Sequence, residues 1–149
     1  MNIFSEKPLP RGYSFAKPSD INADEAVSLF RASELMPSHP SDYTTLQEWD
    51  ELIQESIEVV GVRDRDKILV GIGFLTGDLK QGALANLSVH PRHRHQGLGR
   101  AIVSERIRIA DKLDIPKIDT LLIPTNNLRQ FYVELGFTAV DTMNFTRQK

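Results

Sequence analysis

Cysteine is absent from the 149 residues of the chain, which excludes disulfide bonds, thiolate metal sites and a cysteine nucleophile. Long apolar runs are absent as well, so we expect no transmembrane helix and no membrane partner. Residues 1–6 lack a basic stretch followed by an apolar core, and we therefore expect no signal peptide and a cytoplasmic protein. The composition, with 40% hydrophobic and 26% charged residues, is typical of a folded chain, and the length predicts one domain, residues 1–149.

Acidic residues are missing from Leu79 to Ser104. Residues 1–78 carry 14 acidic and 7 basic side chains, whereas residues 79–149 carry 6 acidic and 11 basic ones. The second half is therefore suited to an anion and the first half to a cation, although ordinary solvated surface explains the same asymmetry. The basic stretch is short and has no aromatic residues among its arginines, so we expect no nucleic-acid partner.

Alternating and helical periodicities predict an α/β (α+β) fold, a mixed and mostly antiparallel sheet of six to seven strands flanked by about four helices. The predicted order is β-α-α-β-β-β-α-β-α-β-β. The predicted strands are residues 12–16, 57–62, 67–76, 82–89, 118–123, 138–140 and 143–147. The first predicted helix runs to Ser33 after a cap at Ser19 or Asp20, and the second starts at Thr44 or Thr45 and runs to Glu55, with a capping box at Thr45–Glu48. The third and fourth predicted helices are residues 97–113 and 128–135.

Helical spacing also predicts which side chains are buried. The first helix is expected to bury Ala26, Leu29 and Phe30. The triplet Gly71-Ile72-Gly73 lies inside a predicted strand and indicates a bulge or close backbone packing. The long third helix is expected to bury Leu98, Ile102, Ile109 and Leu113, in a stripe widened by Val103, Ile107 and Ala110.

The segment from Val89 to Arg100 joins a predicted strand to this long helix. A helix start offers backbone N–H groups that have no partner within the helix, and Gly97 and Gly99 let an oxyanion approach that backbone closely. The sequence therefore predicts a phosphate or pyrophosphate site. It is not a Walker A loop, because no Gly-Lys-Ser/Thr follows, and Ile102 stands where the third Rossmann glycine belongs. Cationic donors are added by Arg92, Arg94 and Arg100.

The stretch from Arg94 to Gly99 resembles the acyl-CoA loop, Arg/Gln-x-x-Gly-x-Gly/Ala, of the GCN5-related N-acetyltransferases (GNAT family). The stretch from Phe131 to Phe137 is similar to the Phe/Leu-Tyr-x-x-x-Gly-Phe segment of the same family. The resemblance covers essentially the whole chain, closely from Gly82 to Val140 and only by the order of elements before that.

This resemblance implies an acetyl-CoA site. Backbone N–H groups of the loop would bind the pyrophosphate, and the main chain before the loop would pair with the pantetheine arm between splayed strands 82–89 and 118–123. The N–H of Val89 would polarise the thioester carbonyl, and Tyr132 would protonate the leaving thiolate, unless it is simply a core aromatic. The residues implied in cofactor binding are Leu87, Ser88, Val89, Arg94, His95, Gln96, Gly97, Leu98, Gly99, Arg100 and Asn127.

Two positions depart from the family's pattern. Thr125 stands where the family often has an amide, so either its hydroxyl or the amide of Asn126 or Asn127 would contact the cofactor. Residues 83–88 hold no titratable side chain, so the general base is not identified; a relay through Asn86 or Ser88, a carboxylate of the first half, and bulk solvent remain open. Three histidines, His90, His93 and His95, lie among arginines, and we expect them beside the phosphates and not on a metal.

The sequence thus predicts an acetyl-CoA-dependent N-acetyltransferase in which a primary amine attacks the thioester directly. The acidic first half favours a small cationic amine. Two alternatives stay open: a non-catalytic acyl-CoA sensor or interaction module, and an enzyme acting on a protein lysine or N-terminus; a homodimer is compatible with each. The acids expected near the acceptor are Glu34, Asp42, Glu48 and Glu51.

Overall fold

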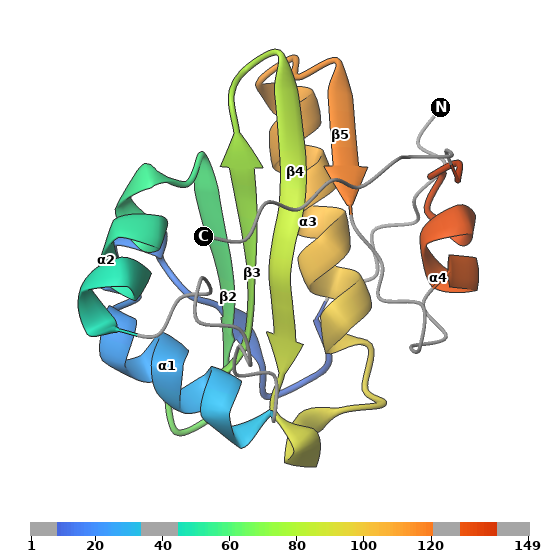
Figure 1. Ribbon diagram of the computed structural model, residues 1–149. Coiled ribbons are helices and arrows are strands. Elements are labelled where there is room, and N and C mark those ends of the chain that lie inside the picture. Colours follow the sequence, from blue (N-terminus) through green and yellow to red (C-terminus); the bar gives the residue numbers. More distant parts are fainter. Residues whose placement is uncertain (1–8, 34–44, 121–128, 140–149) are drawn as a thin grey trace, which may run out of the picture. The chain divides into compact units, whose positions relative to one another are not determined.

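A computed structural model describes residues 9–33, 45–120 and 129–139 (Figure 1). The contacts within the chain divide it into two units, of which the larger is Glu6–Leu121 and the smaller combines Met1–Ser5 with Leu122–Lys149. The larger unit holds the sheet and three α-helices, and the smaller one holds a short fourth helix. None of the described helices has the length and apolarity needed to cross a membrane.

The larger unit is built on a five-stranded sheet in the order β1-β2-β3-β4-β5. Three neighbouring pairs are antiparallel, and β4 and β5 are parallel, so the predicted mixed and mostly antiparallel sheet is confirmed. The predicted strand 138–140 is wrong at Thr138 and Ala139, which have no strand structure, and strand 143–147 lies outside the described residues. The strands are β1 (Ser14–Phe15), β2 (Glu58–Arg63), β3 (Leu69–Gly77), β4 (Gln81–Val89) and β5 (Lys117–Thr120).

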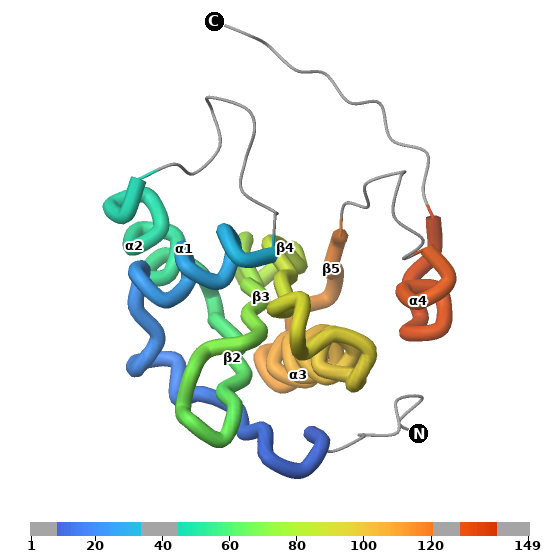
Figure 2. The backbone as a smooth tube through the Cα atoms, turned by 90° about the horizontal axis from the view of Figure 1, so that it is seen from below, coloured from blue at the N-terminus to red at the C-terminus, as the bar shows by residue number. Residues whose placement is uncertain are grey.

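Helices lie on both faces of this sheet (Figure 2). Helices α1 and α2 cover one face, and α3 covers the other. The first helix begins later than predicted, because Pro18–Asp20 forms a separate 3-10 turn (η1) and Asn22, not Ser19 or Asp20, is the N-cap. The helices are α1 (Ala23–Ala32), α2 (Leu46–Glu55), α3 (Leu98–Lys112) and α4 (Arg129–Glu134), and a second 3-10 turn, η2, is Pro91–His93.

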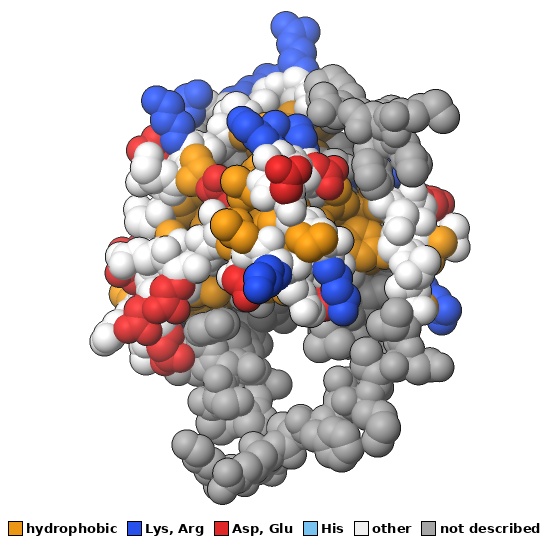
Figure 3. Space-filling view, turned by 90° about the horizontal axis from the view of Figure 1, so that it is seen from above, with side chains coloured by type: hydrophobic (Ala, Val, Ile, Leu, Met, Phe, Trp, Pro, Cys, Tyr) orange, Lys and Arg blue, Asp and Glu red, His pale blue; other side chains and the backbone are white. Residues whose placement is uncertain are grey.

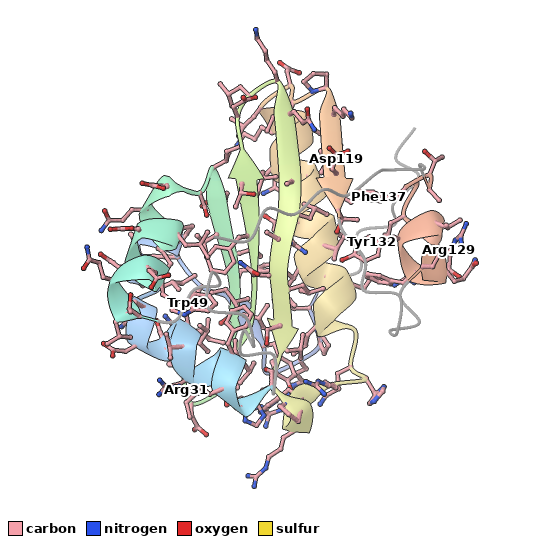
Figure 4. The ribbon with its side chains drawn as sticks, viewed as in Figure 1. Arg31, Trp49, Asp119, Arg129, Tyr132 and Phe137 are labelled. Carbon is pink, nitrogen blue, oxygen red and sulfur yellow. The ribbon has the colours of Figure 1, made fainter. Side chains whose placement is uncertain are left out.

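The core between the sheet and helices α1 and α2 is aromatic. Trp49 of α2 is 1% exposed, and its ring centroid lies 4.6 Å from that of Phe30 and 6.4 Å from that of Phe74. Figure 4 shows Trp49 on the side of α2 that faces the sheet. Ala26, Leu29 and Phe30 are buried as predicted, so the amphipathic reading of the first helix is confirmed.

The core on the α3 face is closely packed at two glycines of β3. A Cβ atom on Gly71 would lie 2.8 Å from Ile102 Cδ1, and one on Gly73 would lie 2.9 Å from Arg106 Cζ. The prediction of close backbone packing at these glycines is therefore confirmed. The predicted stripe fails at its end, because Leu113 is the C-cap of α3 and is 43% exposed, while Arg106 is fully buried in the middle of the helix.

The end of the sheet that carries the β3–β4 turn and the C-terminus of α3 has a mixed surface. Leu79 and Leu113 are both exposed there. Figure 3 looks onto this end and shows hydrophobic side chains interspersed with basic and acidic ones. The glycine-bearing loop lies at the other end of the sheet, between β4 and α3 (Figure 1).

Candidate active site

The connection from β4 to α3 begins with a capped turn. His90 accepts a hydrogen bond at Nδ1 from the backbone N–H of Arg92 (3.1 Å), and its own N–H donates to Val70 O (2.8 Å). The pKa of His90 lies below its ordinary value, first because the ring is partly buried and then because His93, Arg92 and Arg94 are nearby. His90 therefore acts as a neutral acceptor that starts the η2 turn.

The start of α3 has an open N-terminus. Its N-cap is Gly97, in the left-handed conformation with φ of 82°, and no side chain caps the helix. The first bond within the helix runs from Ala101 N–H to Gly97 O (3.0 Å). Within the described part of the chain, no hydrogen bond satisfies the backbone N–H groups of the five residues before Arg100, namely His95, Gln96, Gly97, Leu98 and Gly99.

The side-chain position of Gly97 is open. A Cβ placed on Gly97 would have no neighbour within 4 Å, and the first turn of α3 contains no acidic residue. Unpartnered N–H groups at the positive end of a helix bind anions. The geometry therefore agrees with the predicted pyrophosphate site, to which Arg94, His95, Gln96, Gly97, Leu98, Gly99 and Arg100 were assigned.

Two side chains hold the loop in place. The guanidinium of Arg94 donates from Nε to Val89 O (3.0 Å) and from Nη2 to Ser33 O (3.3 Å). Tyr13 Oη lies 2.8 Å from His93 Nδ1 and donates to Gln96 Oε1 (3.2 Å). The sequence does not single out Tyr13 or Ser33, since both meet the segment from Val89 to Arg100 only through contacts between residues at least 56 positions apart.

The pairing of β4 with β3 is irregular in the half of β4 that leads to the loop. A bulge interrupts its register with β3, so that the single residue Gly73 stands opposite Asn86 and Leu87, and Asn86 has a φ of 52°. Arg106 donates from Nη1 to Phe74 O (2.9 Å) and Ala85 O (3.2 Å), on both strands beside the bulge. A buried guanidinium thus satisfies carbonyl groups next to the irregularity.

On its β5 side, the pairing of β4 is described at the end of the strand that is far from the loop. The parallel pairing runs only from Gln81 to Leu84, opposite Lys117 to Thr120. Because His90 N–H donates to Val70 O, the antiparallel alternation turns the N–H and C=O of Val89 away from β3. The main chain of Val89 therefore faces the side on which the sequence predicts the pantetheine arm.

The neighbouring Ser88 is not exposed to that side. It is 1% exposed, and its hydroxyl donates to the hydroxyl of Ser33 at the end of α1 (2.6 Å). Ser33 in turn donates to Leu29 O (2.8 Å). Ser88 thus fixes β4 against α1, and the same alternation turns its N–H and C=O towards Ile72 of β3, so Ser88 is not placed for the predicted contact with the pantetheine arm.

Helix α4 carries the predicted acid. Tyr132 is 5% exposed, and its ring packs edge-on against Phe131 (5.2 Å between centroids) and Phe137 (5.4 Å). Figure 4 labels Tyr132 and Phe137. Gly136, with φ of 95°, follows the helix as predicted for a C′ residue. In the described residues, the Tyr132 hydroxyl has no hydrogen-bond partner. Asn127 lies outside the described residues.

No metal centre is assembled in the described ranges, and the two described acids that were predicted near the acceptor lie on α2. Residues 9–33, 45–120 and 129–139 contain no group of three or more His, Asp or Glu side chains that would hold a metal ion. Glu48 and Glu51 lie on α2, where Glu48 accepts from Thr45 and Glu51 from Gln47. Glu34 and Asp42 lie outside the described residues.

Comparison with known proteins gives a consistent picture. The model of the acetyltransferase (GNAT) family matches residues 23–137. A GNAT-family acetyltransferase from Streptococcus pneumoniae TIGR4 is 17% identical, with a TM-score of 0.71 over 91% of this chain and 99% of that chain. Glucosamine-6-phosphate N-acetyltransferase from Arabidopsis thaliana is 12% identical, with a TM-score of 0.67 over 91% and 97% of the two chains.

A third solved structure of similar fold contains a ligand. AAC(6')-Iy in complex with the bisubstrate analog CoA-S-monomethyl-acetylneamine is 17% identical, with a TM-score of 0.70 over 92% of this chain and 98% of that chain. A search among curated protein sequences finds no relative. At these identities the structural likeness establishes the fold, whereas the family match rests on the sequence itself.

Proposed function

The chain belongs to the acetyltransferase (GNAT) family, whose model matches most of its length, and we propose on that premise that it transfers the acetyl group of acetyl-CoA to the primary amine of a small cationic molecule. Membership of the family confirms the predicted class of enzyme, an N-acetyltransferase. The observation that carries the proposal is the open N-terminus of α3, where five backbone N–H groups lack a described partner in front of an unobstructed glycine.

The pyrophosphate of acetyl-CoA fits this N-terminus chemically. An anion there receives several N–H groups and the helix dipole, and no acidic residue in the first turn repels it. The fold neighbour AAC(6')-Iy holds an analog that contains CoA, which supports CoA as the cofactor. We assign Leu87 and Val89 to main-chain contacts with the pantetheine arm, because the alternation of the β3–β4 pairing turns the N–H and C=O of Val89 away from β3.

The proposed reaction is direct transfer. The neutral amine nitrogen attacks the thioester carbonyl to give a tetrahedral intermediate, whose ammonium group loses a proton to water. The carbon–sulfur bond then breaks, the CoA thiolate takes a proton from the Tyr132 hydroxyl, and the Tyr132 phenolate takes a proton from solvent. The N–H of Val89 stabilises the oxyanion. Water is the assigned proton acceptor because residues 83–88 have no titratable side chain and the Ser88 hydroxyl is bonded to Ser33.

The first experiment measures acetyl-CoA binding by calorimetry and CoA release with a thiol reagent across polyamines, amino acids, aminoglycosides, arylalkylamines and basic peptides. We expect micromolar-range binding and release that depends on a small cationic amine. Release with basic peptides alone would replace the proposed acceptor by a protein amine. Tight binding without release on any acceptor would instead favour an acyl-CoA sensor, for which the missing general base is the supporting observation.

The role of Tyr132 has its own test. Replacing it in Tyr132→Phe removes the hydroxyl and keeps the ring that packs on Phe131 and Phe137. Turnover should fall by about a hundredfold, which is typical for the loss of a general acid, while the Kd of acetyl-CoA stays within about twofold. Undiminished turnover in this variant would remove Tyr132 from the mechanism and leave it as a core aromatic.

A further inference from the structure

We propose that Tyr13 is a positioning residue of the acetyl-CoA site, whose hydroxyl holds the β4–α3 loop in the shape that presents its N–H groups to the pyrophosphate. The inference rests on the proposed function, because the loop is taken to bind CoA. Tyr13 lies just before β1, about 80 positions from the loop, and does not belong to either motif that identifies the family.

The hydroxyl of Tyr13 contacts both ends of the short segment from His93 to Gln96. It lies 2.8 Å from Nδ1 of His93, the last residue of η2, and donates to Oε1 of Gln96, the residue before the N-cap glycine (3.2 Å). A hydroxyl has one proton, so donation to Gln96 means that it accepts from His93 Nδ1–H. One oxygen atom thus ties the turn before the loop to the start of α3.

The position of that oxygen is set by the core. The ring of Tyr13 packs against the buried cluster that joins the sheet to α3, and it meets the His93 ring edge-on with centroids 5.7 Å apart. The same cluster includes Leu98, the first residue of α3. The hydroxyl is therefore a fixed point relative to the helix whose N-terminus binds the anion. The cluster consists of Val60, Val62, Val70, Leu98 and Ile102.

The span between the two contacts is conformationally demanding. His95 adopts a left-handed conformation with φ of 63°, which costs energy for a residue with a side chain, and Gly97 is also left-handed. The loop leaves its N–H groups unpartnered, and Arg92, Arg94 and His93 place basic groups close together. Without outside contacts, such a loop would sample other shapes before a ligand arrives.

Two side chains, Arg94 and Tyr13, connect the loop to other parts of the fold. Arg94 anchors it to Val89 O and Ser33 O, and Tyr13 anchors it through His93 and Gln96. A loop already held in its binding shape loses less conformational freedom when the ligand binds, and so binds it more tightly. Removing the Tyr13 hydroxyl should therefore weaken the binding of a ligand that contacts the loop and leave the binding of other ligands unchanged.

The size of the effect follows from the exposure of the contact. A cavity of about 310 Å³ opens beside Tyr13, His93 and Gln96, so water has access to these polar groups. A solvent-accessible hydrogen bond between neutral groups contributes modestly, and we expect its loss to weaken binding by about fivefold. The remaining residues that line the cavity are Arg11, Gly12, Asp64, Arg65 and Asp66.

The test uses Tyr13→Phe, which keeps the ring in the core and deletes only the hydroxyl. Calorimetry would compare two probes: CoA, whose pyrophosphate reaches the loop, and S-acetylpantetheine, which lacks it. The Kd of CoA should rise about fivefold in Tyr13→Phe, whereas the Kd of S-acetylpantetheine stays unchanged. Ser14→Ala is the matched control, because it deletes an exposed hydroxyl on the next residue and should change neither value.

A second pair of variants tests the same contact from the loop. Asn at position 93 keeps a polar group close to the place of Nδ1, so His93→Asn should retain most of the CoA affinity that His93→Ala loses. Combining Tyr13→Phe with His93→Ala should cost less than the product of the single losses, because both variants break one contact.

The outcomes separate this inference from the proposed function. A wild-type protein that binds neither probe would refute the proposed function. Wild-type binding of CoA together with unchanged affinity in Tyr13→Phe would refute the positioning role and leave the proposed function standing. An equal loss for both probes with a lower Tm would also refute it, since Tyr13 would then act on stability alone.

Discussion

The N-termini of α1 and α2 are closed by side chains, whereas the N-terminus of α3 is open. In α1, Asn22 accepts from the Glu25 N–H (3.0 Å), and Glu25 accepts from the Asn22 N–H (3.1 Å). In α2, Thr45 accepts from the Glu48 N–H (3.1 Å). The start of α3 has a glycine cap, no side-chain bond and no acidic residue in its first turn.

The difference separates helix starts that stabilise the fold from one that is available to a ligand. Capping side chains satisfy N–H groups that would otherwise lack partners, and each contributes about 1 kcal/mol to stability. The α3 start forgoes that contribution, and its longest-range contacts, through Tyr13 and Arg94, hold the loop without occupying its N–H groups. An open helix start that is nevertheless held in place is what a binding site for an anion requires.

The largest expected effect comes from closing this open start. Gly97→Val places a branched side chain in front of the N–H groups and at a φ of 82°, which a β-branched residue does not tolerate. Acetyl-CoA affinity should fall on the order of a hundredfold, since both the approach and the loop shape are lost. Calorimetry measures the affinity, and thermal unfolding measures the accompanying loss of stability.

A matched control separates backbone strain from lost binding. Gly77 has a similar φ of 98° but lies in the β3–β4 turn, at the other end of the sheet. A Cβ at Gly77 would collide with the carbonyl of Gln81, so Gly77→Ala should lower stability and leave acetyl-CoA affinity intact. If Gly97→Val bound acetyl-CoA as well as Gly77→Ala does, the α3 start would not be the pyrophosphate site.

The second effect concerns the closed start of α1. The carboxylate of Glu25 receives two bonds from Arg63 (2.7 and 3.0 Å), and these bonds are the first cause of its pKa lying below the ordinary 4.5. Glu25→Gln keeps an acceptor for the Asn22 N–H but loses the ion pair. The free energy of unfolding at pH 7 should fall by about 1–2 kcal/mol, as measured by urea denaturation.

The pH dependence gives this prediction its sign. Because the pKa of Glu25 is lower in the folded protein, its contribution is complete above pH 4.5 and is lost as the pH falls below that value. The stability gap between wild type and Glu25→Gln should therefore narrow between pH 5 and pH 3. A gap that stays constant over this range would mean that the ion pair with Arg63 contributes nothing.

The contrast also explains what the sequence could and could not predict. The cap at Thr45, the glycine at the start of α3 and the buried face of α1 are patterns within a few residues, and local chemistry determines them. The prediction places the start of α1 too early, because Ser19 and Asp20 are also polar and precede Asn22 in the sequence. Only the structure shows that Asn22 is the residue that accepts from the Glu25 N–H.

The partners that support the loop are a different matter. Tyr13 and Ser33 act through contacts that the fold creates between distant segments, and no local pattern distinguishes them. Arg106 could have been noticed in the sequence, because it is a charged residue within an apolar helical stripe. The space for its side chain is provided by Gly73, which has no Cβ atom. The exposure of Leu113 was missed because the hydrophobic spacing continues one residue beyond the end of α3.

The smallest expected effect concerns the start of the η2 turn, which is capped by a titratable side chain. His90 closes it with a neutral nitrogen, so its cap depends on pH, unlike those of Asn22 and Thr45. The pKa of His90 in the folded protein is below the ordinary 6.5; the cap is therefore fully present above pH 6.5 and weakens as the pH falls, since the unfolded chain then binds more protons. His90→Asn keeps an acceptor that does not titrate.

Wild type should accordingly lose about 0.5 kcal/mol more stability than His90→Asn between pH 7 and pH 5, a range in which Glu25 stays ionised. The comparison is by urea denaturation at each pH. Parallel pH profiles would show that the ring of His90 is not the acceptor in the turn. A steeper wild-type profile would instead mean that acidification releases one of the contacts that hold the β4–α3 loop, the one made by His90. The contact through Arg94 persists over the same range, because a guanidinium stays charged throughout it.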